Sequence, residues 1–109
     1  MPVTTIKSED QFKEVLSKPG FKGIEFVAPW EEACKAITPK WKQLAENDRW
    51  KEIEFYRVDI CDQQEVAMTA GVKSAPVFQF YSGEAKVKEL HTSTASELER
   101  TVGAVLAGH

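Results

Sequence analysis

Apolar positions along this chain follow two periods, one of two residues and one of three to four. Stretches with the shorter period, or with an unbroken apolar run, predict β-strands. These stretches are residues 3–6, 23–28, 53–59, 77–81 and 85–90. Ser82-Gly83-Glu84 separates the last two and predicts a hairpin turn.

The longer period predicts two helices in the first half of the chain. The first spans residues 9–17, and Ser8 is placed to cap it. The second follows Pro29 and continues to about Asn47. Pro39 lies inside this second helix and predicts a kink, because proline removes a backbone donor and crowds the preceding turn.

Two further helical segments lie in the second half. Residues 62–69 predict a short helix that Gly71 ends, and Thr94 or Ser96 can cap a C-terminal helix. The predicted order is therefore βαβαβαββα. This order is typical of an α/β domain with parallel strands first and an antiparallel pair at the end.

Composition narrows the class of protein. The chain has 109 residues, of which 42% are hydrophobic and 28% charged, with a net charge of −3, so we expect one globular domain over residues 1–109. The sequence has no basic stripe, which argues against nucleic acid as a partner. It also has no apolar run that approaches the roughly 20 residues needed to span a bilayer. Two widely separated cysteines and no signal-peptide h-region favour the cytoplasm. We expect a monomer or a weak dimer.

Residues 30–34, Trp-Glu-Glu-Ala-Cys, carry the most specific signal. This segment resembles the redox motif of the thioredoxin family, Trp-Cys-x-x-Cys, with glutamate in place of the first cysteine. Further residues match the family at its spacing: Pro39, Val58-Asp59, Gly71-Val72, Ser74-Ala75-Pro76 and Gly83. The resemblance implies a thioredoxin fold, with a central mixed sheet flanked by helices and a cis peptide bond before Pro76.

The resemblance also implies a surface that meets a partner. In the family, the residues matching Trp30, Ala75 and Pro76 line a groove that takes an extended peptide, so we expect protein or peptide partners. His91 belongs to the same predicted surface, where the family usually has glycine. A side chain there would narrow the groove, although a lone histidine is more often simply solvated.

Glu31 takes the position of the family's nucleophilic thiol, at a helix N-terminus that stabilises anions. The simplest interpretation is that Glu31 and Glu32 cap the helix, and a direct role in binding or catalysis is the alternative. Ala33 completes the motif before Cys34, which takes the buried, resolving position. Burial and two neighbouring carboxylates should keep the Cys34 thiol protonated.

Cys34 leaves several roles open. It can be an inert core thiol, or a reactive monothiol that forms mixed disulfides with proteins or with glutathione. Dithiol reduction through Cys34 alone is blocked, because its mixed disulfide has no resolving partner. No metal site and no cofactor are expected, since no second sulfur ligand lies near Cys34 in the sequence.

Two more residues are candidates. Glu25 is an acid within an apolar strand, and the family has there a buried acid that moves the proton of the resolving cysteine. If Glu25 is buried, its pKa should be raised, and its role is either structural or that of an acid and base for Cys34. Cys61 follows the third strand and could be a surface thiol or an unreactive loop cysteine, and a bond to Cys34 is not expected.

Three hypotheses follow. The chain can bind partners without turning over disulfides, which the missing nucleophile favours. It can instead use Cys34 for monothiol chemistry in redox homeostasis, or act as an oxidoreductase whose cycle an external thiol completes. The expectation leans against dithiol reductase activity.

Overall fold

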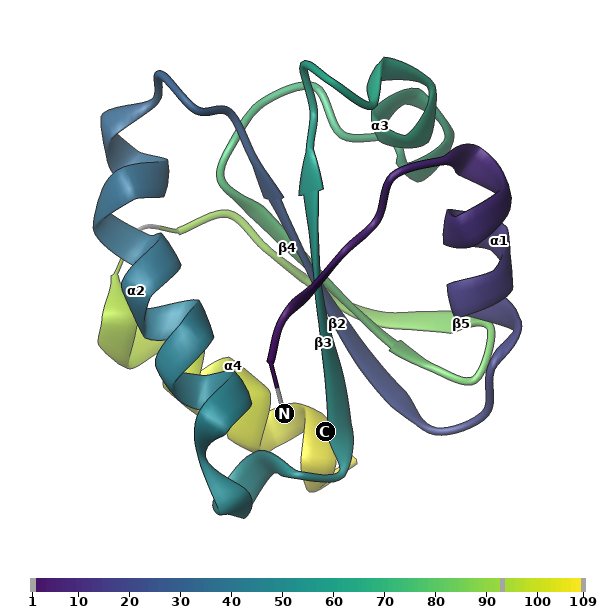
Figure 1. Cartoon of the computed structure of the whole chain (residues 1–109). Helices are drawn as coiled ribbons and strands as arrows, with labels where there is room; N and C mark the ends of the chain where they lie inside the picture. The colour runs from purple at the N-terminus through teal and green to yellow at the C-terminus, as the bar shows by residue number, and fades with distance from the viewer. Residues whose placement is uncertain (1, 93, 109) are drawn as a thin grey trace.

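A five-stranded mixed sheet forms the centre of the molecule (Figure 1). The computed structural model describes residues 2–92 and 94–108. The strand order is β1-β3-β2-β4-β5. The strands are β1 (Thr4–Thr5), β2 (Phe21–Val27), β3 (Ile53–Asp59), β4 (Val77–Ser82) and β5 (Ala85–Leu90). β1, β2 and β3 are parallel, whereas β4 runs antiparallel to β2 and to β5.

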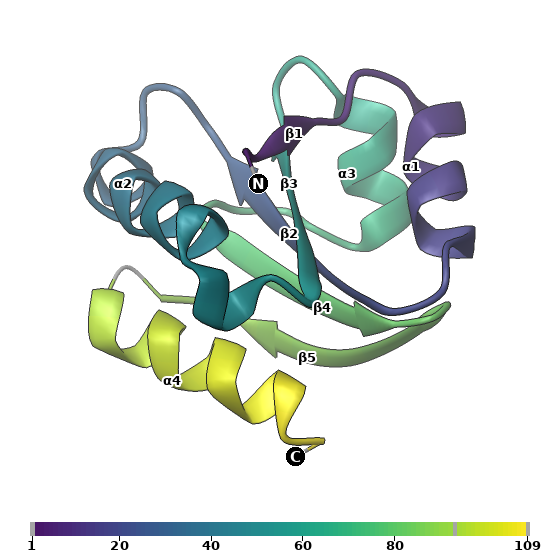
Figure 2. The same ribbon diagram turned by 60° about the horizontal axis from the view of Figure 1, so that its bottom comes forward.

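Helices cover both faces of this sheet. They are α1 (Glu9–Ser17), α2 (Glu32–Glu46), the 3₁₀ helix η1 (Asp48–Trp50), α3 (Gln64–Ala70) and α4 (Ala95–Leu106). Figures 1 and 2 show α1 and α3 on one face and α2 and α4 on the other. The expected βαβαβαββα order is therefore present, with η1 added between α2 and β3.

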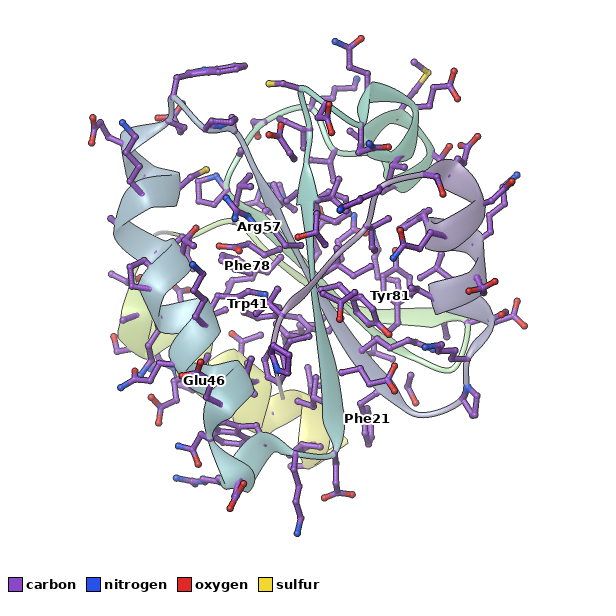
Figure 3. The ribbon with its side chains drawn as sticks, in the orientation of Figure 1. Phe21, Trp41, Glu46, Arg57, Phe78 and Tyr81 are labelled. Atoms are coloured by element: carbon purple, nitrogen blue, oxygen red, sulfur yellow. The ribbon has the colours of Figure 1, made fainter. Side chains whose placement is uncertain are left out.

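The alternation of side chains along each strand divides the core into two layers. Ile24, Phe26 and Tyr56 belong to the layer that includes residues of α1 and α3. The other layer is built around Trp41 of α2, which is fully buried and whose indole N–H donates to the Tyr56 carbonyl at 3.0 Å. Figure 3 shows Trp41, Phe78 and Arg57 between α2 and the sheet, with Tyr81 on the α1 side.

Trp41 requires glycine at position 23 of β2. A Cβ atom on Gly23 would lie 2.7 Å from Cη2 of Trp41 and 3.1 Å from a ring carbon of Phe80. Such distances are below van der Waals contact, so only glycine lets the indole reach the strand.

Several predicted boundaries shift by one to three residues. The first strand is shorter than residues 3–6, and β2 begins at Phe21, two residues before the predicted start. α3 begins at Gln64 rather than at residue 62, because Oδ1 of Asp59 accepts the backbone N–H groups of Cys61 and Asp62 at 2.9 and 3.2 Å. This local turn competes with an earlier helix start.

The helix ends also differ from the simplest expectation. Ser8 caps α1 as predicted, accepting the Gln11 N–H at 3.0 Å. Thr94 occupies the N-cap position of α4 but makes no capping bond to the backbone, and its hydroxyl donates to Glu97 instead. η1 was not predicted. Asn47 ends α2 and caps the start of η1, where its side chain accepts the Arg49 N–H at 2.9 Å.

Candidate functional site

The topology gathers the predicted surface residues at one end of the sheet. The loop that carries Trp30 follows the last residue of β2, and register pairs Phe26 of β2 with Val77 of β4. Ala75 and Pro76 therefore lie beside that loop, and the peptide bond between them is cis, as the resemblance implied.

Trp30 is an exposed aromatic side chain at this end of the sheet. Its exposed fraction is 67%, which is unusual for so large an apolar residue. Within the described residues, neither the N–H nor the C=O of Ala75 takes part in a backbone hydrogen bond, because β4 begins only at Val77. An apolar anchor and an unpaired stretch of backbone thus share this surface.

Glu31 is the N-cap residue of α2, but it does not cap the helix as expected. Its side chain makes no capping hydrogen bond and is exposed to solvent. Its backbone carbonyl instead accepts from the N–H groups of Cys34 and Lys35 at 3.1 and 3.2 Å. Glu32 is also exposed and pairs with Lys35 at 3.6 Å. Both carboxylates therefore act on the helix end through their charge rather than through capping bonds.

Cys34 lies in the first turn of α2 and points into the protein. Only 3% of it is exposed, and its Sγ accepts the Ala28 N–H at 3.5 Å. Burial raises the pKa of the thiol above 9.0, the Ala28 N–H opposes this, and the charges of Glu25 and Glu31 raise the pKa further. The expectation of a protonated thiol holds, but the second carboxylate is Glu25 rather than Glu32.

Glu25 lies on β2 beneath the motif and is fully buried, which meets the condition for a raised pKa. Its Oε2 accepts the Thr38 hydroxyl at 2.9 Å, whereas Oε1 has no hydrogen-bond partner among the described residues. Burial raises the pKa of Glu25 from 4.5 to about 7, although the Thr38 hydrogen bond and the positive charges of Arg57 and Lys42 lower it. Glu25 is thus set to change charge near neutral pH.

Arg57 of β3 completes the charged group under the motif. The parallel register places it directly opposite Glu25, on the α2 side of the sheet (Figure 3). No described ion pair joins the two side chains, and the Nε of Arg57 is buried without a partner. Its charge nevertheless favours the ionised forms of both Glu25 and Cys34.

His91 follows β5 at the same end of the sheet, because register pairs Leu90 with Phe78. Its Nε2 lies 2.7 Å from Oε2 of Glu89, and the ring is mostly exposed. Hydrogen bonds from His91 and Lys86 lower the pKa of Glu89 to about 2. Within the described residues, no hydrogen bond or ion pair joins His91 to Cys34 or Glu31, so its observed contacts belong to β5.

Cys61 lies at the carboxyl end of β3, on the other side of β2 from Pro76. It is half-buried, and both Cys61 and Cys34 are free thiols. Burial and the Asp59 carboxylate raise the pKa of the Cys61 thiol.

The described residues contain neither a cluster of metal-ligating side chains nor a helix that could span a membrane. Among residues 2–92 and 94–108, no group of three or more His, Cys, Asp or Glu side chains is placed to hold a metal ion. In the same residues, no helix combines the length and apolar character needed to cross a bilayer.

Comparison with known proteins assigns the chain to a family. The family model described as Thioredoxin matches residues 3–104. The chain belongs to the thioredoxin family. Thioredoxin from Rattus norvegicus is 36% identical over 102 residues, which cover 92% of this chain and 95% of that protein. Thioredoxin from Ovis aries is 34% identical over 106 residues, covering 95% and 99%.

Solved thioredoxins have the same architecture. The crystal structure of Malassezia sympodialis thioredoxin has a TM-score of 0.87 and 28% identity, covering 94% of this chain and 92% of that one. A Plasmodium falciparum thioredoxin structure also has a TM-score of 0.87, at 24% identity, and supports the fold alone. The chain thus has the thioredoxin fold, a mixed sheet flanked by helices.

Two residues of this thioredoxin-family site were missed from the sequence. Thr38 lies four residues after Cys34, so helical geometry places both on the inward face of α2. Arg57 lies two residues after Phe55 and four after Ile53, so the alternation of a strand places all three on the same, inward face of β3. A charged residue at an inward position was the signal that could have identified Arg57 as a neighbour of Glu25.

Proposed function

We propose that this chain is a thioredoxin-family protein that binds extended segments of partner proteins and does not reduce disulfides through a dithiol cycle. The partner surface consists of Trp30, Ala75, Pro76 and His91. Cys34 and Glu25 remain as a buried thiol and acid beneath it.

The residue at position 31 carries the proposal. A dithiol cycle needs an attacking thiolate and a second thiol that resolves the mixed disulfide. Glu31 supplies a carboxylate where the family motif has the attacking thiol, and Cys34 is 3% exposed with a raised pKa. A buried, protonated thiol is a poor nucleophile, so Cys34 does not replace the missing group.

Binding is supported by the surface beside the motif. An exposed aromatic side chain is a typical anchor for a partner, and unpaired backbone groups next to a strand can pair with an extended peptide. An open depression of about 300 Å³, lined in part by Met68, Gly71 and Lys73, adjoins the loop that leads to Pro76. Met68 is 77% exposed and adds apolar surface to this side.

Selection of linear peptides tests the binding surface. Peptides displayed on phage are selected against the protein, and the bound sequences are titrated into ¹⁵N-labelled protein. We expect the largest shifts at the Trp30 indole and at Ala75, and a loss of affinity in Trp30→Ala. Val87→Ala is the matched control, because Val87 is also an exposed apolar side chain but lies beside Phe21 and Ser82, at the other end of the sheet. Peptides that bind equally well to Trp30→Ala would contradict the proposal.

Monothiol chemistry at Cys34 is the second candidate. It is favoured by Glu25, whose charge acts on the Cys34 thiol and whose pKa of about 7 suits proton transfer. Glutathione is the simplest partner for such a thiol. Mass spectrometry after incubation with glutathione disulfide distinguishes the candidates, because this one requires a mixed disulfide at Cys34 that forms faster than at Cys61.

The free thiols support a reducing compartment. Both cysteines are free, and a chain with two unpaired thiols suits a reducing environment such as the cytoplasm. We propose that the protein acts there as a monomer or a weak dimer, without nucleic acid as a partner.

A further inference from the structure

An open depression lies between η1 and α4, and η1 follows the C-terminal end of α2, opposite to the first turn of α2 that holds Cys34. β3 begins just after η1, whereas the motif follows the last residue of the parallel strand β2. The volume of the depression, about 550 Å³, lies within the roughly 300–1,000 Å³ typical of small-molecule sites. It is lined by Arg49, Trp50, Ser96, Glu99, Arg100 and Gly103.

The charge of this lining is positive. Glu99 is its one acid, and Oε1 of Glu99 lies 2.6 Å from the ammonium group of Lys40. That contact lowers the pKa of Glu99, so the carboxylate is ionised and already neutralised by Lys40. Arg49 and Arg100 form no ion pair within the described part of the chain, and both are exposed to solvent. Two guanidinium groups therefore line the depression without an ion-pair partner among the described residues, although the charge of Arg49 also acts on Glu99.

Trp50 belongs to this lining, and its ring supports the Arg49 guanidinium. Trp50 is only 4% exposed, and its indole N–H has no hydrogen-bond partner among the described residues. The Arg49 guanidinium lies 4.7 Å from the centre of the Trp50 ring and holds its donors over the indole. Gly103 packs against the same ring, at a distance that leaves the depression open.

We propose that the Arg49/Arg100 depression binds a phosphate group. Arginine presents several N–H donors in a planar fork that matches the oxygens of phosphate, and two arginines balance its double negative charge. The Ser96 hydroxyl provides a neutral donor beside them. The volume exceeds that of a single phosphate, so the group can belong to a larger organic molecule. This site is independent of the surface around Trp30.

Titration with inorganic phosphate tests the proposal, with ionic strength held constant by sodium chloride. The readout is the indole N–H signal of Trp50 in the ¹H–¹⁵N spectrum, assigned with Trp50→Phe. We expect a saturable shift of this signal, with the signals of Trp30 and Trp41 unchanged. Acetate should cause a much smaller effect. A non-saturable shift, no shift, or an equal affinity for acetate would overturn the assignment.

Two kinds of variant sharpen the test. Arg49→Gln and Arg100→Gln should each weaken phosphate about tenfold, as the loss of one charge-assisted hydrogen bond predicts. Lys51→Gln is the matched control, because this exposed cation follows η1 but does not line the depression. Glu99→Gln should strengthen binding, since it frees Lys40. Equal effects of Lys51→Gln and Arg100→Gln would contradict a built site and leave only general charge attraction.

Discussion

Thr38 of α2 donates its hydroxyl to one oxygen of the Glu25 carboxylate at 2.9 Å, while the other oxygen has no described partner. The pair joins the helix that carries the motif to the central strand of the sheet. Because half of the carboxylate is unsatisfied, burial outweighs the hydrogen bond, and the pKa of Glu25 rises to about 7.

The first prediction concerns pH-dependent stability. The folded-state pKa of Glu25 exceeds its ordinary value of 4.5, so the native protein holds an extra proton up to about pH 7. Stability is therefore greatest below pH 4.5 for this group and falls as pH rises through 7. Relative to Glu25→Gln, the wild type should lose roughly 3 kcal/mol between pH 4.5 and pH 8.

Urea unfolding of both proteins at several pH values measures this difference. Glu46→Gln is the control, because Glu46 is an exposed acid on α2, the helix whose Thr38 contacts Glu25. A stability difference between wild type and Glu25→Gln that stays constant across this range would contradict the buried, protonated acid.

The second prediction concerns Thr38→Val, which keeps the side-chain shape and removes the hydroxyl. The hydrogen bond lowers the pKa of Glu25, so its loss should raise that pKa above 7. The cost should be about 1.5–3 kcal/mol at pH 9, where the carboxylate is charged, and smaller at pH 5. Thr69→Val, whose hydroxyl bonds Glu9 at the surface, should have a minor effect at both pH values.

The third prediction concerns close packing at Gly23. Gly23→Ala places a methyl group 2.7 Å from the fully buried Trp41, so we expect a loss of about 1–3 kcal/mol. Gly103→Ala is the control, because its Cβ would lie 3.6 Å from Trp50, and alanine favours a helix by about 1 kcal/mol over glycine. Thermal unfolding should show opposite signs for the two substitutions, and equal destabilisation would count against the packing argument.

The fourth prediction concerns thiol reactivity. Cys34 is almost completely buried, and its pKa is raised by burial and by two carboxylates, whereas Cys61 is half-buried in a turn. Iodoacetamide should therefore modify Cys61 first and Cys34 only after slow opening of the structure. Mass spectrometry of Cys61→Ser isolates the Cys34 rate. Rapid modification of Cys34 in that variant would favour the monothiol function.

Much of this account could be predicted from the sequence, because local patterns carry it. The apolar periods gave every helix and strand except η1, and the apolar strand around Glu25 identified it as an acid that could be buried. The start of η1 depends on a hydrogen bond from the Arg49 N–H to the Asn47 side chain. The spacing of apolar residues does not predict such a bond. The neighbours of Glu25 depend on strand register and on the rotation of α2, so Thr38 and Arg57 emerged only in three dimensions.

The absence of capping by Glu31 has the same origin. The sequence predicted that Glu31 caps the helix, but a carboxylate at a helix start favours the dipole without a capping bond, and the sequence does not determine its rotamer. In the structure the side chain turns to solvent and leaves the backbone donors of the first turn uncapped by it. The site therefore retains a helix end that can stabilise a thiolate.

Insulin reduction with dithiothreitol as the external thiol tests the central claim most directly, namely that Glu31 replaces the group needed for disulfide turnover. Wild type and Glu31→Ser should give no reduction above the dithiothreitol blank, whereas Glu31→Cys should give turnover because it restores the attacking thiol on the same helix end. Robust wild-type turnover that Cys34→Ser abolishes would contradict the account.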